Sequence, residues 1–362
     1  MKRNFTLVFS LLAVLTLTSV QAATSISGYF DMEMFKKKDK APTYRQHHMN
    51  LMMQHEVDIY KFFTEVEFED ATDMNWGNKQ SQSPSTGYAK GDFAKGSVQG
   101  RLFVERAWAE ANFSKYFSLR MGQMLHGSLF YQNHYPSIAL YTGKQFTRKT
   151  IFGRNILGLR ITGNLGMGIS YQLWNGKDNN AVTNEGNGAK LAWAGMLGQA
   201  SVSTGVQMAK YNGTANAVDQ DALGFEASVD AMGFGLWFEY GTRKMNNDTV
   251  KFSTARAAEA KTMDILLSYT MDMEEMGEFV PFFMYSTHEG TGFQKGDVTA
   301  DSYYTDKKEM IFGVNYRPLP TITWKLQYKN QPKTTSYDNT DTLNKGAVDS
   351  NEVALAFVYF YN

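Results

Sequence analysis

The sequence predicts an all-β fold, a transmembrane antiparallel β-barrel, for which sixteen strands is the count that fits best. Three observations predict it. Apolar and polar residues alternate one by one along many segments, and short and long connections follow one another in turn. Aromatic residues make up 14% of the chain, yet no apolar run after residue 22 is long enough for a helical membrane span. Together these features favour strands as the membrane-crossing elements.

The alternation gives each segment one apolar face and one polar or small face, because successive side chains of a strand point to opposite sides. At the end of the chain the apolar face consists of Val353, Leu355, Phe357, Tyr359 and Tyr361. Three other segments repeat the pattern: Ile322, Trp324, Leu326 and Tyr328 alternate with Thr323, Lys325, Gln327 and Lys329; Phe234, Leu236, Phe238 and Tyr240 alternate with Gly235, Trp237, Glu239 and Gly241; and Met167, Ile169, Tyr171 and Leu173 alternate with Gly168, Ser170, Gln172 and Trp174. We expect the polar faces to line the lumen.

This pattern predicts sixteen strands, most of them about 10 residues long, a length that suits a tilted strand crossing a bilayer. The expected strands are 25–36, 43–56, 60–71, 101–113, 117–124, 156–163, 166–175, 188–196, 199–210, 220–231, 234–244, 261–271, 278–288, 306–316, 320–331 and 350–361. The boundaries leave fourteen or eighteen strands open as alternatives.

The expected connections alternate in length, as the short periplasmic turns and longer outer loops of outer-membrane barrels do. Short turns are expected at 57–59, 114–116, 164–165, 197–198, 232–233, 272–277 and 317–319, and longer loops between the other strands. This order places both termini in the periplasm. Two soluble alternatives are less consistent with the sequence. A β-helix should show a short repeat, and none is present. A large β-sandwich rarely needs so many aromatic residues at strand ends.

The first 22 residues are expected to be a signal peptide. Lys2 and Arg3 precede an uncharged, mostly apolar run, and the segment Val20–Ala22 has small residues at the −3 and −1 positions of a cleavage site. Without it, 34 basic and 36 acidic side chains remain, so bulk charge gives no indication of nucleic-acid binding. The chain has no Cys, which excludes disulfides, thiol catalysis and Cys-based metal sites. The barrel domain is expected to span 23–362.

Aromatic residues lie near the expected short-turn ends of the strands, where an interfacial girdle of a membrane barrel would lie. They are Phe62, Phe63, Tyr116, Phe117, Trp174, Tyr316 and Tyr361.

The loop at 125–155 is the strongest candidate for a pore constriction. The surrounding stretch from Ala111 to Lys177 contains no Asp or Glu. Its basic side chains include the candidate constriction residues Arg120, Lys144, Arg148, Lys149, Arg154 and Arg160. Positive charge in a narrow, low-dielectric passage concentrates anions. The alternative is that these side chains bind lipopolysaccharide phosphates or form a solvated surface loop.

Other candidate pore-lining residues have mixed charge. Glu65 and Glu67 share one face of the third strand, and Phe62 and Val66 lie on the other. Lys325 lies on the polar face of a later strand. A wall carrying both signs makes any anion preference mild.

Neither a metal site nor an active site is expected. The segment 47–55 contains His and Met residues that would suit Cu(I), but Met49, Leu51 and Met53 fit a lipid-facing stripe better, and neighbours on one strand face lie about 7 Å apart. Ser128 has His126 and His134 nearby in sequence, but no G-x-S-x-G or H-E-x-x-H motif is present. We therefore expect no enzyme and no cofactor.

The stretch from Gly100 to Pro136 resembles the phosphate-selective porin superfamily. The similarity is carried by the segments 103–108 (Phe-Val-Glu-Arg-Ala-Trp) and 119–123 (Leu-Arg-Met-Gly-Gln), and by an aromatic loop ending at 134–136 (His-Tyr-Pro). The resemblance implies a sixteen-stranded, homotrimeric channel of a Gram-negative outer membrane with an inward-folded third loop. Members line the pore with many arginines, whereas this region offers few, and the chain ends one residue after its last aromatic residue.

The expected function is a water-filled outer-membrane channel for passive diffusion of small hydrophilic solutes, with a mild preference for anions. Its expected partners are outer-membrane lipid, lipopolysaccharide and the solutes themselves. The alternative is a structural or ligand-binding barrel, such as an adhesin or a complex component, with a plugged lumen. Trp108, Trp174 and Trp237 lie on expected inward faces and keep this alternative open, because they could fill a lumen.

Overall fold

In the computed structural model, the described residues are 23–38, 41–69, 101–125, 151–152, 155–178, 185–212, 219–246, 259–290, 304–331, 335–337, 343–344 and 351–361. The expected signal peptide and most of the loop at 125–155 lie outside them. No helix in the described part of the chain is long and apolar enough to span a membrane.

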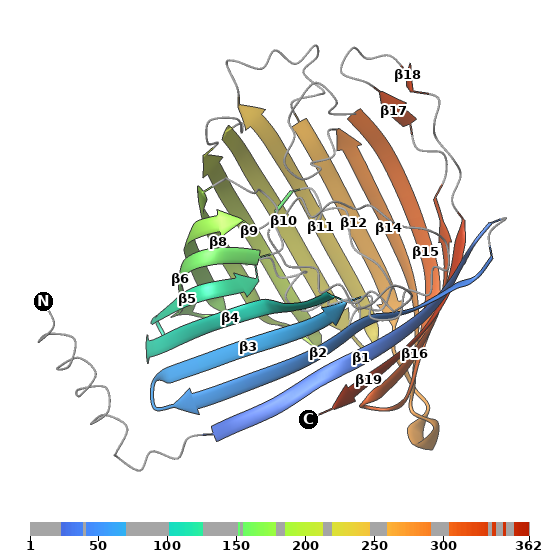
Figure 1. The fold of residues 1–362 in the computed structure, drawn as a ribbon, viewed down its shortest axis with the longest axis horizontal. Helices are drawn as coiled ribbons and strands as arrows, with labels where there is room; N and C mark the ends of the chain where they lie inside the picture. Colours follow the sequence, from blue (N-terminus) through green and yellow to red (C-terminus); the bar gives the residue numbers. More distant parts are fainter. Residues whose placement is uncertain are drawn as a thin grey trace, which may run out of the picture.

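The described chain forms a tilted antiparallel barrel (Figure 1). Its strands are β1 (Ala23–Lys37), β2 (Thr43–Val57), β3 (Tyr60–Glu69), β4 (Arg101–Ser114), β5 (Phe117–Leu125), β6 (Asn155–Gly166), β7 (Ile169–Asp178), β8 (Glu185–Leu197), β9 (Ala200–Asn212), β10 (Asp219–Ala231), β11 (Phe234–Asn246), β12 (Glu259–Tyr269), β13 (Met271–Asp272), β14 (Glu278–Gly290), β15 (Tyr304–Leu319), β16 (Ile322–Asn330), β17 (Thr335–Tyr337), β18 (Leu343–Asn344) and β19 (Glu352–Tyr361). One short 3₁₀ helix, η1 (Glu274–Met276), precedes β14.

Sixteen of these strands build the barrel wall, which confirms the expected count. β12 pairs with one part of β14, and β13 pairs with the adjoining part of the same strand. β13 therefore continues the wall strand that β12 begins. β17 and β18 form a small hairpin beyond one end of the barrel (Figure 1). Each pair of wall neighbours is antiparallel, and seven short connections alternate with longer ones, as the sequence predicted.

The barrel closes where β1 pairs with both β2 and β19. On the outer face Gly28 lies opposite Tyr361, and the Tyr361 ring covers the glycine. The Tyr361 hydroxyl donates a 2.6 Å hydrogen bond to the Asn50 carbonyl oxygen on β2. One side chain of the last strand thereby joins three strands at the closure. A Cβ atom at position 28 would collide with that ring and carbonyl.

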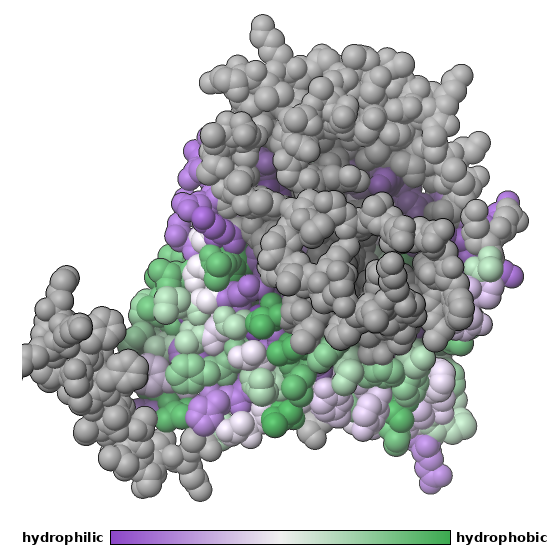
Figure 2. Space-filling view, in the orientation of Figure 1, coloured by the Kyte–Doolittle hydropathy of each residue, from purple (hydrophilic) through white to green (hydrophobic). Residues whose placement is uncertain are grey.

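The two faces of the wall differ as the alternation predicted. Large apolar side chains are exposed on the outside, among them Met121, Phe225, Trp324 and Leu355. In the view of Figure 2, hydrophobic residues predominate over the lower part of the described wall, with hydrophilic ones at its upper left edge. Most of the buried charged side chains face inward, which is the arrangement that a lipid-facing barrel requires.

Two turns and two aromatic residues differ from expectation. The β15–β16 turn is at 320–321, not at 317–319, because β15 extends to Leu319. The β6–β7 turn is at Met167–Gly168, not at 164–165, and Met167 is 90% exposed in the turn rather than in a strand. Both turn residues have positive φ (48° and 78°), the geometry of a tight hairpin turn. Trp174 does not belong to an interfacial girdle, because it lies well along β7 with its side chain buried on the inner face. Phe63 lies on the inner face of β3, stacked on Trp108, so it does not belong to an outer interfacial girdle.

The described end of the third long loop lies inside the barrel. Ile151 and Phe152 are 0% and 4% exposed and belong to an inner apolar cluster. They pack against Gly224 of β10 and Gly241 of β11, which face each other in the sheet. The Ile151 carbonyl oxygen accepts a 3.3 Å hydrogen bond from Arg243. This placement agrees with the inward loop that the resemblance implied.

Replacing Tyr361 by Phe should weaken barrel closure. The change removes the hydrogen bond to Asn50 while keeping the ring, so we expect the free energy of unfolding to fall by about 0.5–1.5 kcal/mol. Urea unfolding from lipid vesicles, followed by tryptophan fluorescence, measures the change. Tyr359→Phe, on the same outer face of β19, is the matched control and should leave the midpoint unchanged. Equal midpoints for both variants would show that the hydrogen bond does not hold the closure.

Replacing Gly224 by Leu should displace the loop end. A Cβ atom at this position would already lie 2.7 Å from the Phe152 ring. Because the chain has no Cys, an Ile151→Cys variant gives a single reporter for a water-soluble maleimide. We expect Gly224→Leu to speed labelling by at least about tenfold. A tenfold faster rate corresponds to a loss of about 1.4 kcal/mol in the free energy with which the loop end docks. A Met167→Cys reporter in the exposed turn should label equally fast with and without Gly224→Leu. Unchanged labelling of Cys at 151 would contradict the docking.

Candidate functional site

The inner wall of the barrel is the candidate functional site, because it concentrates charge that a membrane protein otherwise keeps out of its apolar parts. Among the described residues, nine acidic side chains are buried: Asp31, Glu33, Glu65, Glu67, Glu105, Glu110, Glu226, Glu239 and Asp264. Four basic ones are buried with them: Arg160, Lys190, Arg243 and Lys325. The buried part of the described wall is therefore mixed in charge, with an acidic excess that the partly buried Arg106 and Arg120 reduce.

A stack of charged and aromatic side chains crosses the inner faces of β3, β4 and β5. The rings of Phe63 and Trp108 stack with their centroids 5.3 Å apart. The Arg106 guanidinium lies 4.8 Å from the Phe63 centroid, and that of Arg120 lies 3.8 Å from the Trp108 centroid. Arg106 also forms an ion pair with Glu65. Both rings thus hold a guanidinium group against the wall by cation–π attraction.

Arg120 and Arg160 bring two guanidinium groups to neighbouring strands. They face each other directly in the pairing of β5 with β6. Arg120 donates to Glu110 at 2.6 Å, and Arg160 donates to the Leu125 carbonyl oxygen. The Nε of Arg160 is buried and has no hydrogen-bond partner in the described part of the chain. Two like charges opposite each other on adjacent strands repel, so the pair favours a nearby anion.

The other described pore-lining candidates also lie on the inner wall. Glu65 and Glu67 are fully buried on β3, and Glu65 accepts a hydrogen bond from Asn50. Lys325 is 1% exposed on β16, directly opposite Asn315 of β15. The alternation in sequence predicted these faces correctly, whereas the cross-strand partners could not be inferred without the register.

The three expected inward tryptophans contact the inner apolar clusters. Trp174 is buried beside Tyr211, with ring centroids 5.9 Å apart, in the cluster that holds the loop end. Trp108 packs against the same cluster. Trp237 packs against a second cluster on β12, β14 and β15. Part of the lumen is therefore apolar.

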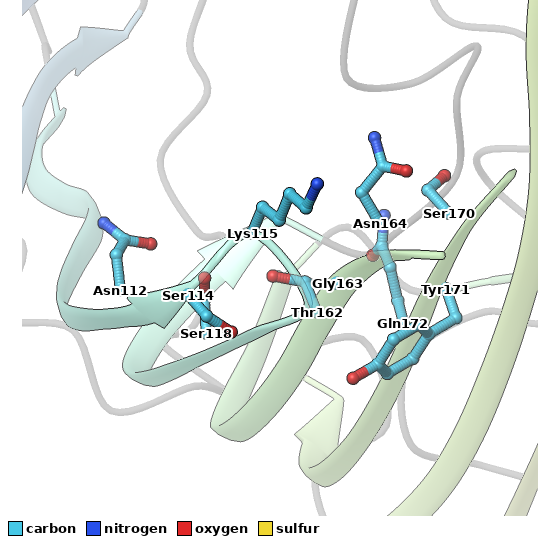
Figure 3. A pocket seen from close by; sticks show the side chains of 10 residues that line it. All are labelled: Asn112, Ser114, Lys115, Ser118, Thr162, Gly163, Asn164, Ser170, Tyr171 and Gln172. Carbon is cyan, nitrogen blue, oxygen red and sulfur yellow. The ribbon is translucent and has the colours of Figure 1, made fainter. Parts of the chain in front are cut away.

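A hollow of about 660 Å³ lies at the turn ends of β4 to β7 (Figure 3). Hydroxyl and amide side chains dominate its lining, together with one amine. The lining residues are Asn112, Ser114, Lys115, Ser118, Thr162, Gly163, Asn164, Ser170, Tyr171 and Gln172. Ser118 and Thr162 face each other one inward position along from Arg120 and Arg160. Sequence inspection missed this hollow, because its residues come from four strands and share no motif.

Several candidates lie outside the described residues: Lys144, Arg148, Lys149 and Arg154 of the constriction loop, and Ser128 with its neighbouring histidines. Within the described ranges, no group of three or more His, Cys, Asp or Glu side chains is arranged to hold a metal ion. The expected lipid-facing stripe is present, with Met49 and Met53 exposed on the outer face of β2.

Solved structures with the same fold are outer-membrane proteins. An anion-selective porin from Comamonas acidovorans aligns with a TM-score of 0.60 at 12% identity, over 94% of this chain and 100% of its own. OprB of Pseudomonas putida aligns with a TM-score of 0.59 at 8% identity, over 94% of each chain. The trimer form of OmpT, an outer membrane protein of Vibrio cholerae, aligns with a TM-score of 0.59 at 12% identity, over 94% of this chain and 99% of its own. No family model and no curated protein matches the sequence. The chain thus has the sixteen-stranded antiparallel barrel fold of outer-membrane porins.

Proposed function

We propose that the protein is an outer-membrane porin, a water-filled channel for passive diffusion of small hydrophilic solutes, and not an enzyme. The observation that carries the proposal is the charged inner wall of a sixteen-stranded barrel. A barrel of this size is wide enough for an aqueous channel, and buried charges are tolerated there because water and opposite charges solvate them.

We further propose a mild preference for anions, with Arg120 and Arg160 as its described centre. The two arginines come from the acid-free stretch of the sequence, and their guanidinium groups face each other beside Glu110, the residue directly before that stretch. The loop residues Lys144, Arg148, Lys149 and Arg154 would add positive charge. The other eight buried acids of the described wall keep the preference small.

The proposed setting follows from the same fold. The exposed apolar outer face fits a bilayer, and the expected signal peptide would export the chain to the outer membrane, with both termini periplasmic. We propose contacts with lipopolysaccharide at the outer rim and a homotrimer, by analogy with the trimer form of OmpT.

A second candidate, a binding or structural barrel without an open channel, is favoured by the inner apolar cluster around Trp174, Tyr211 and the loop end. Planar-bilayer recordings distinguish the two, because only an open lumen conducts ions. Steady single-channel conductance is expected, and its absence from folded, inserted protein would favour the second candidate.

Replacing Arg120 and Arg160 by Gln should lower the ratio of chloride to potassium permeability by at least about twofold, since it removes the paired positive charge from the wall. Reversal potentials in a salt gradient measure the ratio. Arg148→Glu with Lys149→Glu should change it in the same direction. Lys261→Gln, which removes a half-exposed lysine paired with Glu259 at an outer strand end, is the control and should leave it unchanged. A clear cation preference of the wild type would contradict the anion proposal.

A further inference from the structure

The hollow at the turn ends of β4 to β7 has a nearly uncharged lining. Its described lining contains no carboxylate and a single base, Lys115. Apart from Gly163, the other lining side chains carry hydroxyl or amide groups. The adjacent β2–β3 turn adds one exposed acid, Asp58. The volume of about 660 Å³ lies within the range of small-molecule sites, roughly 300–1,000 Å³, and the hollow is open on one side, so a solute can enter it.

Two rows of polar side chains form much of the lining. Ser118 lies directly opposite Thr162, and Thr162 lies directly opposite Gln172. One inward position nearer the turn, Asn164 lies directly opposite Ser170, and in Figure 3 these two side chains extend to the same side of the strands. Neighbouring strands are about 4.8 Å apart, and inward positions on one strand are about 7 Å apart. Hydroxyl and amide groups are therefore spread over an area about 10 Å long and 7 Å wide.

Hydrogen bonds within the turns hold part of this lining in place. Asn164 Oδ1 accepts a 2.8 Å hydrogen bond from the Gly166 N–H group, and Ser114 Oγ accepts one of 3.2 Å from the Tyr116 N–H group. The Tyr171 hydroxyl donates a 2.8 Å hydrogen bond to the Tyr116 carbonyl oxygen. The Asn164 oxygen is thus engaged, and its Nδ2 group is left to donate to a ligand. A lining that is held before a solute arrives has a lower entropic cost of binding.

Gln172 supplies an acceptor that needs a donor. Its Oε1 is buried and has no hydrogen-bond partner in the described part of the chain. A buried acceptor without a partner costs free energy. Turning the amide oxygen toward the hollow recovers this cost when the ligand donates a hydrogen bond. A hydroxyl group donates, whereas an anion without a proton, such as sulfate or chloride, only accepts. Gln172 therefore favours a ligand with hydroxyl groups.

The two arginines of the neighbouring wall extend away from the hollow. The Arg120 guanidinium lies over the Trp108 ring, 3.8 Å from its centroid, and Trp108 is farther from the short turns than Arg120 is. Arg160 donates to the carbonyl oxygen of Leu125, the last residue of β5 at the long-loop end. The positive charge of this pair is therefore directed away from the lining.

Two other bases near the turn ends are held in ion pairs. Lys190 of β8 forms a 2.5 Å ion pair with Glu226 across β9. Lys61 of β3 forms a 2.8 Å ion pair with Glu56 of β2. Their charges are largely balanced by these partners, so the hollow presents hydrogen-bonding groups rather than a strong field of one sign.

We propose that the hollow is a binding subsite for uncharged polyhydroxy compounds such as monosaccharides. Hydroxyl groups of the ligand would donate to Gln172 Oε1, accept from Asn164 Nδ2, and exchange hydrogen bonds with the Thr162 hydroxyl. An apolar solute fits less well, because it would leave these groups without partners. An inorganic anion fits less well, since Lys115 is the one base of the described lining. The subsite rests on the proposed function, because it assigns a solute class to the water-filled lumen, but it does not depend on the anion preference.

The probe is glucose, compared with per-O-methylated glucose, which accepts hydrogen bonds but donates none. Planar-bilayer recordings measure how each compound reduces the wild-type current, corrected for the conductivity of the same solution. We expect glucose to reach half of its effect at a concentration at least about tenfold below that of the methylated compound, because only glucose donates to Gln172. Gln172→Met, similar in shape but without Oε1, should raise the half-effect concentration of glucose by about threefold to tenfold. Thr162→Val should raise it by about threefold.

Gln220→Met is the matched control and should not alter the glucose effect. Gln220 also lies on the inner wall with a buried Oε1 that has no partner among the described residues, but near the long-loop end of β10 and outside the hollow. Equal glucose effects in the wild type and in Gln172→Met would overturn the proposal, as would equal potency of glucose and its methylated derivative. A sulfate block stronger than the glucose effect, and removed by Lys115→Gln, would identify an anion site and also overturn it.

Failure of the subsite and failure of the channel are distinguishable. A folded wild type that conducts but does not respond to glucose overturns the subsite and leaves the channel proposal intact. A folded wild type that does not conduct overturns the channel proposal, and calorimetry of glucose binding in detergent micelles then tests the subsite against the same variants. Should Gln172→Met not fold, Thr162→Val decides the question alone.

Discussion

The fold depends on one constraint, that every backbone N–H and C=O group within a membrane must be hydrogen-bonded inside the protein. A sheet satisfies it only by closing, and here the closure is the pairing of β1 with β19. This pairing joins residues 315 to 333 positions apart in the chain, so it has a high entropic cost before it gains any bond. The Tyr361 side chain adds a contact that reaches from β19 over Gly28 to β2, where Gly leaves room for the ring.

Closure, together with the two-residue period of a strand, also decides where the charges lie. Once the sheet is closed, each strand has one face toward lipid and one toward the lumen, so a carboxylate on the inner face needs partners from neighbouring strands. The pairs Arg106–Glu65 and Arg120–Glu110 join adjacent strands in this way, and the pair Lys190–Glu226 reaches across β9 from β8 to β10. Such pairs do little for stability, because desolvation offsets much of their attraction. Their main consequence is the local electrostatic field that a solute in the lumen meets.

The sequence predicted the strands and their faces well, because alternation is a local signal that survives without any knowledge of partners. The alternation alone assigned Glu65, Glu67 and Lys325 to the inner face, where their side chains are buried. The turn at Met167–Gly168 was missed because alternation continues through it, while the backbone reverses there. The docking of Ile151 against Gly241 depends on the register between strands, which the pattern of a single strand does not contain. The same holds for the alignment of Glu226, Glu239 and Asp264 across β10 to β12.

Register therefore turns a wall of mixed charge into sectors of different chemistry. On β5 and β6 it sets Arg120 opposite Arg160, while on β10 to β12 it sets Glu226, Glu239 and Asp264 in line. A shift of one residue in any of these pairings would turn the charges toward lipid. A shift of two would keep them inward but place each beside a different neighbour, such as Glu239 beside Leu266 instead of Asp264. Because the apolar face must point toward lipid, only pairings that differ by an even number of residues are allowed. The selectivity of the lumen depends on which of these pairings forms, since each one sets different inward side chains opposite each other.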